Sequence, residues 1–157
     1  MRLSDLIRAE AIIPDLKATD RNGVIRELVQ ALADHNVIDT DSAELVAKTA
    51  IARENQGSTG FGRGVAVPHV KHDCLKGIVA TVGRSSQGVD FAALDRAPVY
   101  TVFMLLSPAN APEGHLAAME RIFRYLQREN FRRFLRQADT REALIELIRE
   151  ADDLQDD

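Results

Sequence analysis

Residues 57–72 read Gly-Ser-Thr-Gly-Phe-Gly-Arg-Gly-Val-Ala-Val-Pro-His-Val-Lys-His, with four glycines in the first eight positions. Glycine loses more conformational freedom on folding than any other residue, so this cluster indicates unusual backbone angles or close approach by another group. The small apolar run at 65–67 predicts a short buried strand. Pro68 has no N–H to donate to a sheet, so we expect the strand to end there and to present His69 to a crevice.

The composition is that of one globular domain. The chain has 157 residues, of which 45% are apolar and 28% charged, so it can bury a sizeable core. Its apolar runs are too short to span a bilayer, and the charged N-terminus does not resemble a signal peptide. The single cysteine excludes a disulfide framework and favours a cytoplasmic setting. We expect one domain over residues 1–150 and an acidic, frayed tail over residues 151–157.

The charge balance argues against a nucleic-acid-binding protein. Lysine and arginine total 20 against 24 acidic residues, which gives a net charge of −4. One stretch departs from this balance by carrying six arginines: Arg121, Arg124, Arg128, Arg132, Arg133 and Arg136. Such a stretch is either a solvated helix face or a docking surface for an acidic protein partner.

Apolar spacing predicts four helices. The first follows a cap at Thr19-Asp20, the second opens on a capping box at 41–44 and ends near Arg53, the third begins near His115, and the fourth follows residue 140.

Strands are predicted at 65–67, 78–82 and 99–106, the last apolar enough to be covered on both faces. Helices before and after the strands indicate a three-layer α/β/α fold, in the α/β (α+β) class. Because strands and helices do not alternate strictly, we expect a mixed sheet.

Three residues are candidates for binding an anion. His69 is either a turn histidine or a reactive one. His115 shares a helix face with residues 119, 122 and 126, so it points inward at a helix N-terminus; the alternative is a core histidine bonded to a carbonyl. The guanidinium of Arg53 has paired N–H groups that suit the oxygens of a phosphoryl group; the alternative is that its positive charge complements the negative C-terminal end of its helix.

The glycine-rich loop is a further candidate. Backbone amides near Ser58, Thr59 and Gly60 are the kind of groups that bind phosphate. The loop is not a Walker A loop, because it lacks the lysine–hydroxyl pair.

The run from Arg53 to His69 resembles the active-site signature of the fructose/mannitol-type (type 2) enzyme IIA domains of the bacterial phosphoenolpyruvate-dependent phosphotransferase system, including the nitrogen-regulatory branch. The resemblance continues in Gly-Val-Asp-Phe-Ala-Ala-Leu-Asp at 88–95, in the strand at 99–108 and in Pro-Glu-Gly-His-Leu at 112–116. It covers nearly the whole chain.

The resemblance implies a function for the candidate residues. His69 would be the phosphoryl acceptor, His115 a second active-site histidine that stabilises the phosphoryl group, and Arg53 a phosphate-binding side chain. It implies an HPr-like phosphocarrier as donor, and an enzyme IIB domain or a regulated protein as recipient. It implies no metal and no cofactor, no nucleic acid and no membrane insertion.

One position departs from the family pattern. Val70 follows His69 where the family has glycine or another small residue, so we expect bulk beside the imidazole. This valine supports the alternative function, a regulatory binding module that kept the fold and lost phosphotransfer. The absence of a IIB-like or membrane-like segment favours the regulatory branch.

Three other side chains have minor predicted roles. His72 is an extra phosphate donor, half of a His69–His72 metal pair, or simply solvated. His35 is expected to cap the first predicted helix, and Cys74 to be inert packing.

Overall fold

The computed structural model describes residues 2–156. Met1 and Asp157, which the predicted domain and tail include, therefore lie outside the described residues. None of the described helices is both long and apolar enough to cross a bilayer.

Strand β5 (Val99–Ser107) is the centre of a five-stranded mixed sheet, as predicted. On one side it pairs antiparallel with β4 (Val79–Val89). On the other side it pairs parallel with β2 (Val65–Ala66) and then with β3 (His69–Lys71).

Strand β1 (Gly60–Gly62) forms a hairpin with β2. At its tip, Gly62, Arg63 and Gly64 have φ angles of 106°, 62° and 80°. Left-handed backbone of this kind explains two of the four glycines in the opening motif.

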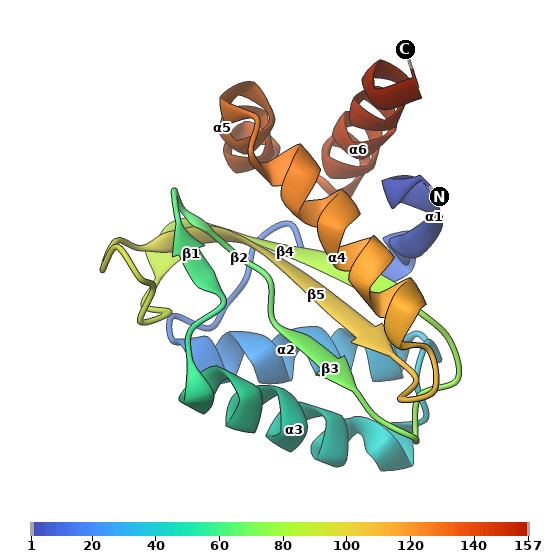
Figure 1. Ribbon diagram of the computed structural model, residues 1–157. Coiled ribbons are helices and arrows are strands. Elements are labelled where there is room, and N and C mark those ends of the chain that lie inside the picture. The colour runs from blue at the N-terminus through green and yellow to red at the C-terminus, as the bar shows by residue number, and fades with distance from the viewer. Residues whose placement is uncertain (1, 157) are drawn as a thin grey trace.

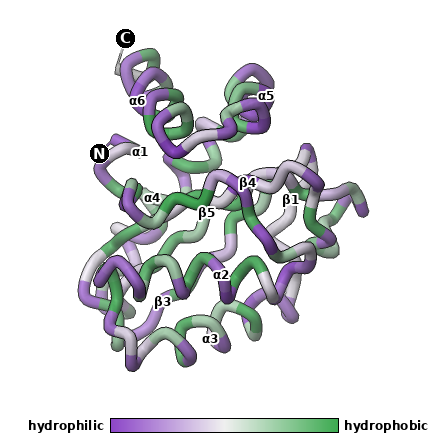
Figure 2. The backbone as a smooth tube through the Cα atoms, turned by 180° about the vertical axis from the view of Figure 1, so that it is seen from behind, coloured by the Kyte–Doolittle hydropathy of each residue, from purple (hydrophilic) through white to green (hydrophobic). Residues whose placement is uncertain are grey.

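Helices cover both faces of the sheet (Figure 1). Helices α2 (Arg21–Asp34) and α3 (Ala43–Gln56) lie on one face. The other face carries the short α1 (Leu3–Leu6), α4 (Pro112–Leu126), α5 (Glu129–Gln137) and α6 (Arg141–Asp156). The view from behind shows hydrophobic β5 between these layers (Figure 2). The predicted three-layer arrangement is confirmed.

Two separate cores follow from the alternation of β5. Val102, Met104 and Leu106 join the core beneath α2 and α3. Phe103 and Leu105 join the core beneath α1, α4, α5 and α6. Successive strand residues face opposite sides of a sheet, so a strand that is apolar at every position is buried on both sides.

The first predicted helix cap is confirmed and the second is not. Asp20 caps α2 by accepting the Gly23 N–H at 2.8 Å. The predicted capping box at 41–44 is wrong, because a 3-10 turn, η2 (Thr40–Ser42), precedes α3 and Ser42 makes no side-chain cap bond. Glu44 instead pairs with Arg26 of α2 at 2.8 Å.

The C-terminal part of the chain is more ordered than the sequence suggested. Helix α6 continues to Asp156, so residues 151–156, predicted to be a frayed tail, belong to a helix. Asp152 is buried and accepts the backbone N–H groups of Leu3 and Ser4 at 2.8 and 3.0 Å and the Tyr125 hydroxyl at 2.5 Å. The acidic segment thus fastens the N-terminus to the helical layer.

The arginine-rich stretch is not one helix face. It is divided between α4, which ends at Leu126, and α5, which begins at Glu129. Arg132 donates to the Leu126 carbonyl at 2.7 Å, and the Arg136 guanidinium lies 3.5 Å from the centre of the Tyr100 ring.

Candidate functional site

His69 is the first residue of β3 and pairs with Leu105 of β5. The expectation that pairing ends at Pro68 is wrong, because the Pro68 carbonyl accepts the Leu105 N–H at 3.0 Å and the chain resumes the ladder at once. Proline removes only a donor, so its carbonyl can still join the sheet. Val67 belongs to the core beneath α4, and by strand alternation His69, two residues later, faces the same side.

The His69 ring is held by one hydrogen bond that also fixes the tautomer of its neutral form. Its Nδ1 lies 3.0 Å from the Val67 carbonyl oxygen. A carbonyl can only accept, so Nδ1 carries the proton and Nε2 keeps its lone pair. A neutral imidazole with an unprotonated nitrogen is a nucleophile at neutral pH.

His115 lies in the first turn of α4, which begins at Pro112, three residues earlier than predicted. The side chain is buried, and its ring centre lies 5.4 Å from that of His69, with the ring planes inclined at 52°. Two imidazoles 46 positions apart in the sequence (115 − 69) therefore meet where β3 begins beside α4.

Ser107 sets the tautomer of His115. Its Oγ lies 2.7 Å from His115 Nδ1, and the serine is fully buried. No other acceptor for the serine hydroxyl hydrogen exists among the described residues. Buried polar hydrogens are almost always bonded, so the hydroxyl donates to Nδ1 and the His115 proton is on Nε2.

The environment keeps His115 neutral. Burial, and to a lesser extent the neighbouring His69 and Lys71, together lower its pKa from the ordinary value of 6.5 to about 4. Desolvation disfavours the charged imidazolium, and nearby positive groups do the same. With both rings neutral, the site therefore combines a lone pair on His69 Nε2 with an N–H donor on His115 Nε2.

Arg53 is near the C-terminal end of α3 and donates from Nη1 to the Gly57 carbonyl at 2.8 Å. In the described part of the chain it makes no hydrogen bond to either imidazole. Guanidinium has five N–H groups, so the others remain available to an anion. The structure thus shows the helix-end interaction, and phosphate binding by Arg53 stays a prediction.

The polar groups of the glycine-rich loop are largely bonded within the protein. Thr59 donates both its backbone N–H and its hydroxyl to Glu54, a carboxylate only 2% exposed. The Gly60 N–H donates to Ser58 Oγ at 3.0 Å, and that hydroxyl donates to the Phe91 carbonyl at 3.3 Å. A phosphate-binding role for Ser58, Thr59 and Gly60 stays a prediction that these bonds do not favour.

Val70 does not crowd the imidazole. Its side chain is 2% exposed and lies in the core beneath α2 and α3, on the opposite face from His69. Its φ angle is not among the positive ones in the described chain. The expected bulk beside His69 is therefore wrong, because consecutive strand residues point to opposite faces.

The remaining candidates are satisfied locally. His72 Nδ1 accepts the Cys74 N–H at 3.0 Å, which caps the end of β3. His35 caps α2 as predicted, with Nδ1 2.9 Å from the Ala31 carbonyl oxygen. The described residues contain no group of three or more potential ligands arranged to hold a metal ion.

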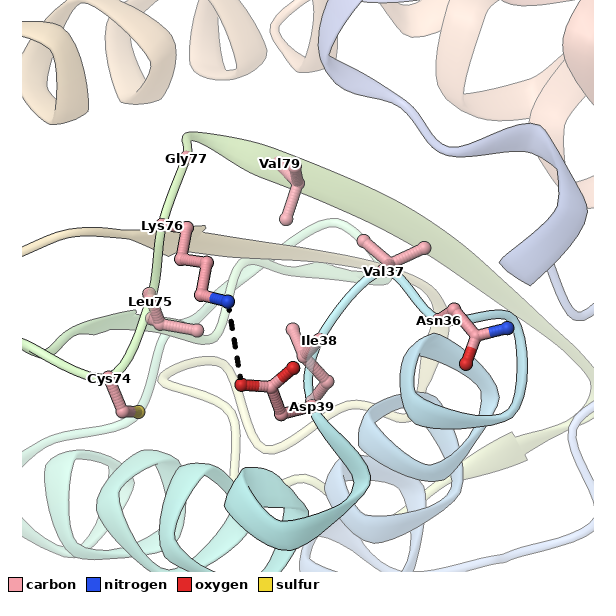
Figure 3. A pocket seen from close by; sticks show the side chains of 9 residues that line it. All are labelled: Asn36, Val37, Ile38, Asp39, Cys74, Leu75, Lys76, Gly77 and Val79. Carbon is pink, nitrogen blue, oxygen red and sulfur yellow. Dashed lines mark ion pairs between the residues drawn. The ribbon is translucent and has the colours of Figure 1, made fainter.

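Cys74 packs against the core beneath α2 and α3 and lines a small hollow of about 150 Å³ (Figure 3). An ion pair between Lys76 and Asp39, 3.8 Å apart, crosses this hollow. Neither histidine of the pair lines it.

Sequence reasoning missed Ser107 and Glu54. Ser107 was detectable as the polar residue that closes an apolar strand eight positions before His115. Glu54 was detectable as an acidic residue directly after Arg53 in a helix that ends beside the glycine cluster. Neither position shows from the sequence that it is buried.

A family model described as phosphoenolpyruvate-dependent sugar phosphotransferase system, EIIA 2, matches residues 5–151. The chain belongs to this EIIA 2 family. The resemblance drawn from the motifs around His69 and His115 is thereby confirmed.

Relatives of this EIIA 2 chain include both transport and regulatory proteins. It is 32% identical over 148 residues to a nitrogen regulatory protein of Bradyrhizobium diazoefficiens, covering 94% of this chain and 95% of that protein. It is 32% identical over 152 residues to the fructose-specific EIIABC component of Bacillus subtilis, covering 97% of this chain and 24% of that protein. The chain thus spans about a quarter of the length of the latter.

Solved structures share the fold of the EIIA 2 chain. The nitrogen regulatory protein IIA-Ntr of Neisseria meningitidis superposes with a TM-score of 0.84 at 27% identity, covering 93% of this chain and 98% of that one. The Escherichia coli enzyme IIA for mannitol, solved in complex with its phosphorylated enzyme IIB, gives a TM-score of 0.76 at 18% identity. The match covers 92% of this chain and 97% of that one.

Proposed function

We propose that this protein is a phosphohistidine carrier in which His69 Nε2 accepts a phosphoryl group from an HPr-like phosphocarrier. The observation that carries this proposal is the bond from His69 Nδ1 to the Val67 carbonyl, since it leaves Nε2 as the nitrogen with a lone pair. The family supports it, because its members are components of the phosphotransferase system.

The proposed transfer needs only groups that the chain and its donor supply. The His69 Nε2 lone pair attacks phosphorus, the N–P bond of the donor phosphohistidine breaks, and the electron pair returns to the donor imidazole. The Val67 carbonyl stays bonded to Nδ1–H and stabilises the positive charge that develops on the His69 ring.

His115 and Arg53 have complementary roles in this proposal. His115 Nε2–H donates to an oxygen of the phosphoryl group on His69, because Ser107 occupies its other nitrogen. Arg53 contributes its unused N–H groups to the other oxygens. Phosphoryl transfer passes through a loose in-line transition state, so positioning and charge stabilisation are what the protein must provide.

The recipient is an enzyme IIB domain or a protein regulated by the phosphorylation state. The first option is supported by the mannitol enzyme IIA that was solved with its phosphorylated IIB. The second is supported by the nitrogen regulatory proteins that match nearly end to end. Either way, the relay would operate in the cytoplasm.

Mass spectrometry of the intact protein tests the acceptor. Wild type incubated with phosphoenolpyruvate, enzyme I and an HPr-like carrier should gain one acid-labile phosphate, and His69→Gln should gain none. His72→Gln is the matched control and should be phosphorylated like wild type. Absence of phosphate on wild type with every carrier tried would favour the binding module, which has lost its structural support because Val70 is buried away from His69.

A further inference from the structure

Three arginines line one hollow at the opposite end of β5 from the histidine pair. They are Arg63 at the hairpin tip and Arg132 and Arg136 on α5, and the hollow has a volume of about 240 Å³. The hairpin tip and α5 lie close to the beginning of β5, whereas β3 and the first turn of α4 lie near its other end (Figure 1). In the β5 register, the hairpin reaches Thr101 and His69 pairs with Leu105, about 13 Å further along the strand.

The positive charge in this hollow is not neutralised internally. None of the three guanidinium groups forms an ion pair with a carboxylate in the described part of the chain. Asp95 is the acidic residue in the lining, and its two oxygens accept the backbone N–H groups of Arg63 and Ala97 at 3.1 and 3.0 Å. Three arginines against one aspartate leave two positive charges (3 − 1) in a protein whose net charge is −4.

Two of the three arginines are held in place. Arg136 stacks on Tyr100, with its guanidinium carbon 3.5 Å from the ring centre, and Arg132 donates Nη1 to the Leu126 carbonyl at 2.7 Å. Each interaction uses one face or one N–H of the guanidinium and leaves other donors unused. Groups fixed before binding lose less entropy when a ligand arrives.

We propose that this hollow is a binding site for a small phosphate monoester. A dianionic phosphate matches its two excess positive charges, and the guanidinium forks match phosphate oxygens in geometry. The Tyr100 ring and Pro98 supply an apolar wall for the carbon part of the ester. A hollow of about 240 Å³ is small for a peptide segment, so the occupant is a small molecule and not an acidic loop of a partner.

Amide NMR titration with glycerol 3-phosphate at constant ionic strength tests this site. We expect saturable shifts at the Gly64 and Thr101 amides, both in wild type and in His69→Ala, because the hollow is separate from the histidine pair. Phosphorylation of His69 can fail or succeed without changing this result. The proposed phosphoryl transfer and the proposed phosphate monoester site can therefore be refuted independently of each other.

Arg63→Gln is the cleanest variant, because the Arg63 side chain makes no bond in the described structure that folding would lose. It should bind the ester about tenfold or more weakly, and Arg136→Gln should do the same. Arg133→Gln is the matched control on the same helix, since it removes the same charge outside the hollow, and its affinity should stay within about twofold of wild type. Thermal unfolding verifies that each variant is folded.

Three results would overturn the proposal. The first is the lack of saturable shifts at Gly64 and Thr101. The second is an equal loss of affinity in Arg63→Gln and Arg133→Gln, which would mean general attraction to a basic surface. The third is tighter binding of a hexaglutamate peptide than of glycerol 3-phosphate at the same amides, which would assign the hollow to an acidic protein segment.

Discussion

Ser107 Oγ lies 2.7 Å from His115 Nδ1 and directs the His115 proton to the nitrogen on the other side of the ring. The serine ends β5 and the histidine lies in the first turn of α4, so the turn between these two elements fixes the tautomer of His115. A donor at Nε2 is useful to a phosphoryl group, whereas a lone pair there would repel it.

Replacing Ser107 with alanine should therefore slow phosphorylation without unfolding the protein. The variant frees His115 to adopt either tautomer. We expect the rate of transfer from the phosphocarrier to fall about tenfold, a part of the roughly 10²–10³ that one fixed hydrogen-bond donor to developing charge contributes. The ring ¹⁵N shifts of His115 should move from the Nε2–H tautomer toward a mixture.

Ser85→Ala is the control for Ser107→Ala, since Ser85 is also a buried serine of the sheet, bonded to the Gly88 N–H. It should leave both the ¹⁵N shifts and the transfer rate unchanged. An unaltered His115 tautomer in Ser107→Ala would show that the serine does not position the ring.

The burial of His115 should make the protein less stable in mild acid. Its pKa is about 4 in the folded protein against 6.5 for an ordinary histidine, so the unfolded chain binds more protons between these values. Stability from this group is complete above pH 6.5 and declines as the pH falls toward 4, by up to about 3 kcal/mol.

The contribution of His115 is isolated by comparing wild type with His115→Gln. The difference in unfolding free energy, measured by urea denaturation, should shrink steadily from pH 7 to pH 4. A difference that stays constant over this range would mean that His115 titrates normally.

Arg53→Gln tests the predicted phosphate contact. We expect phosphorylation of His69 to slow by about 10²-fold, since a donor that stabilises transition-state charge is removed. The phosphorylation rate of Arg53→Lys should lie between those of wild type and Arg53→Gln, because lysine keeps the positive charge but lacks the paired N–H groups of the guanidinium. Lys48→Gln, an exposed cation on the same helix, serves as the control. Arg53→Gln transferring at the wild-type rate would leave this arginine with only its bond to Gly57.

Asp152→Asn should destabilise the protein by about 1–3 kcal/mol, because a buried carboxylate that accepts three hydrogen bonds is lost. Burial would raise the pKa of Asp152, but the bonds from Ser4, Tyr125 and Leu3 outweigh it and hold the pKa below the ordinary value. The stability that this group provides is present above the ordinary pKa of an aspartate and is lost as the pH falls through its lowered folded-state pKa.

Asp153→Asn is the adjacent control, since its carboxylate is exposed and pairs with Arg2 on the surface. The free energy of unfolding of Asp153→Asn should be less than about 1 kcal/mol below that of wild type. Equal losses for the two variants in thermal or urea unfolding would contradict a special role for Asp152.

The sequence by itself determined the central strand, four of the helices and the family, but it did not reveal α1, α5, β1 or β3. The apolar pattern of β5 required cover on both faces, the Asp20 cap located α2, and the motif ending at His69 together with His115 indicated the family. These features depend on residue type and on periods of 2 or 3.6 residues, which are local properties of the chain.

Only the tertiary structure decided which side chains share a space. Strand alternation places Val70 in one core and His69 on the other face of the sheet. Ala151 and Asp152 are buried, and Asp152 accepts hydrogen bonds from the N-terminal backbone. Ser107 contacts His115 across the turn between β5 and α4. Contacts of this kind depend on register and on the packing of distant elements. Because one residue of shift in a strand exchanges its two faces, side-chain neighbours are fixed only when the sheet and helices assemble.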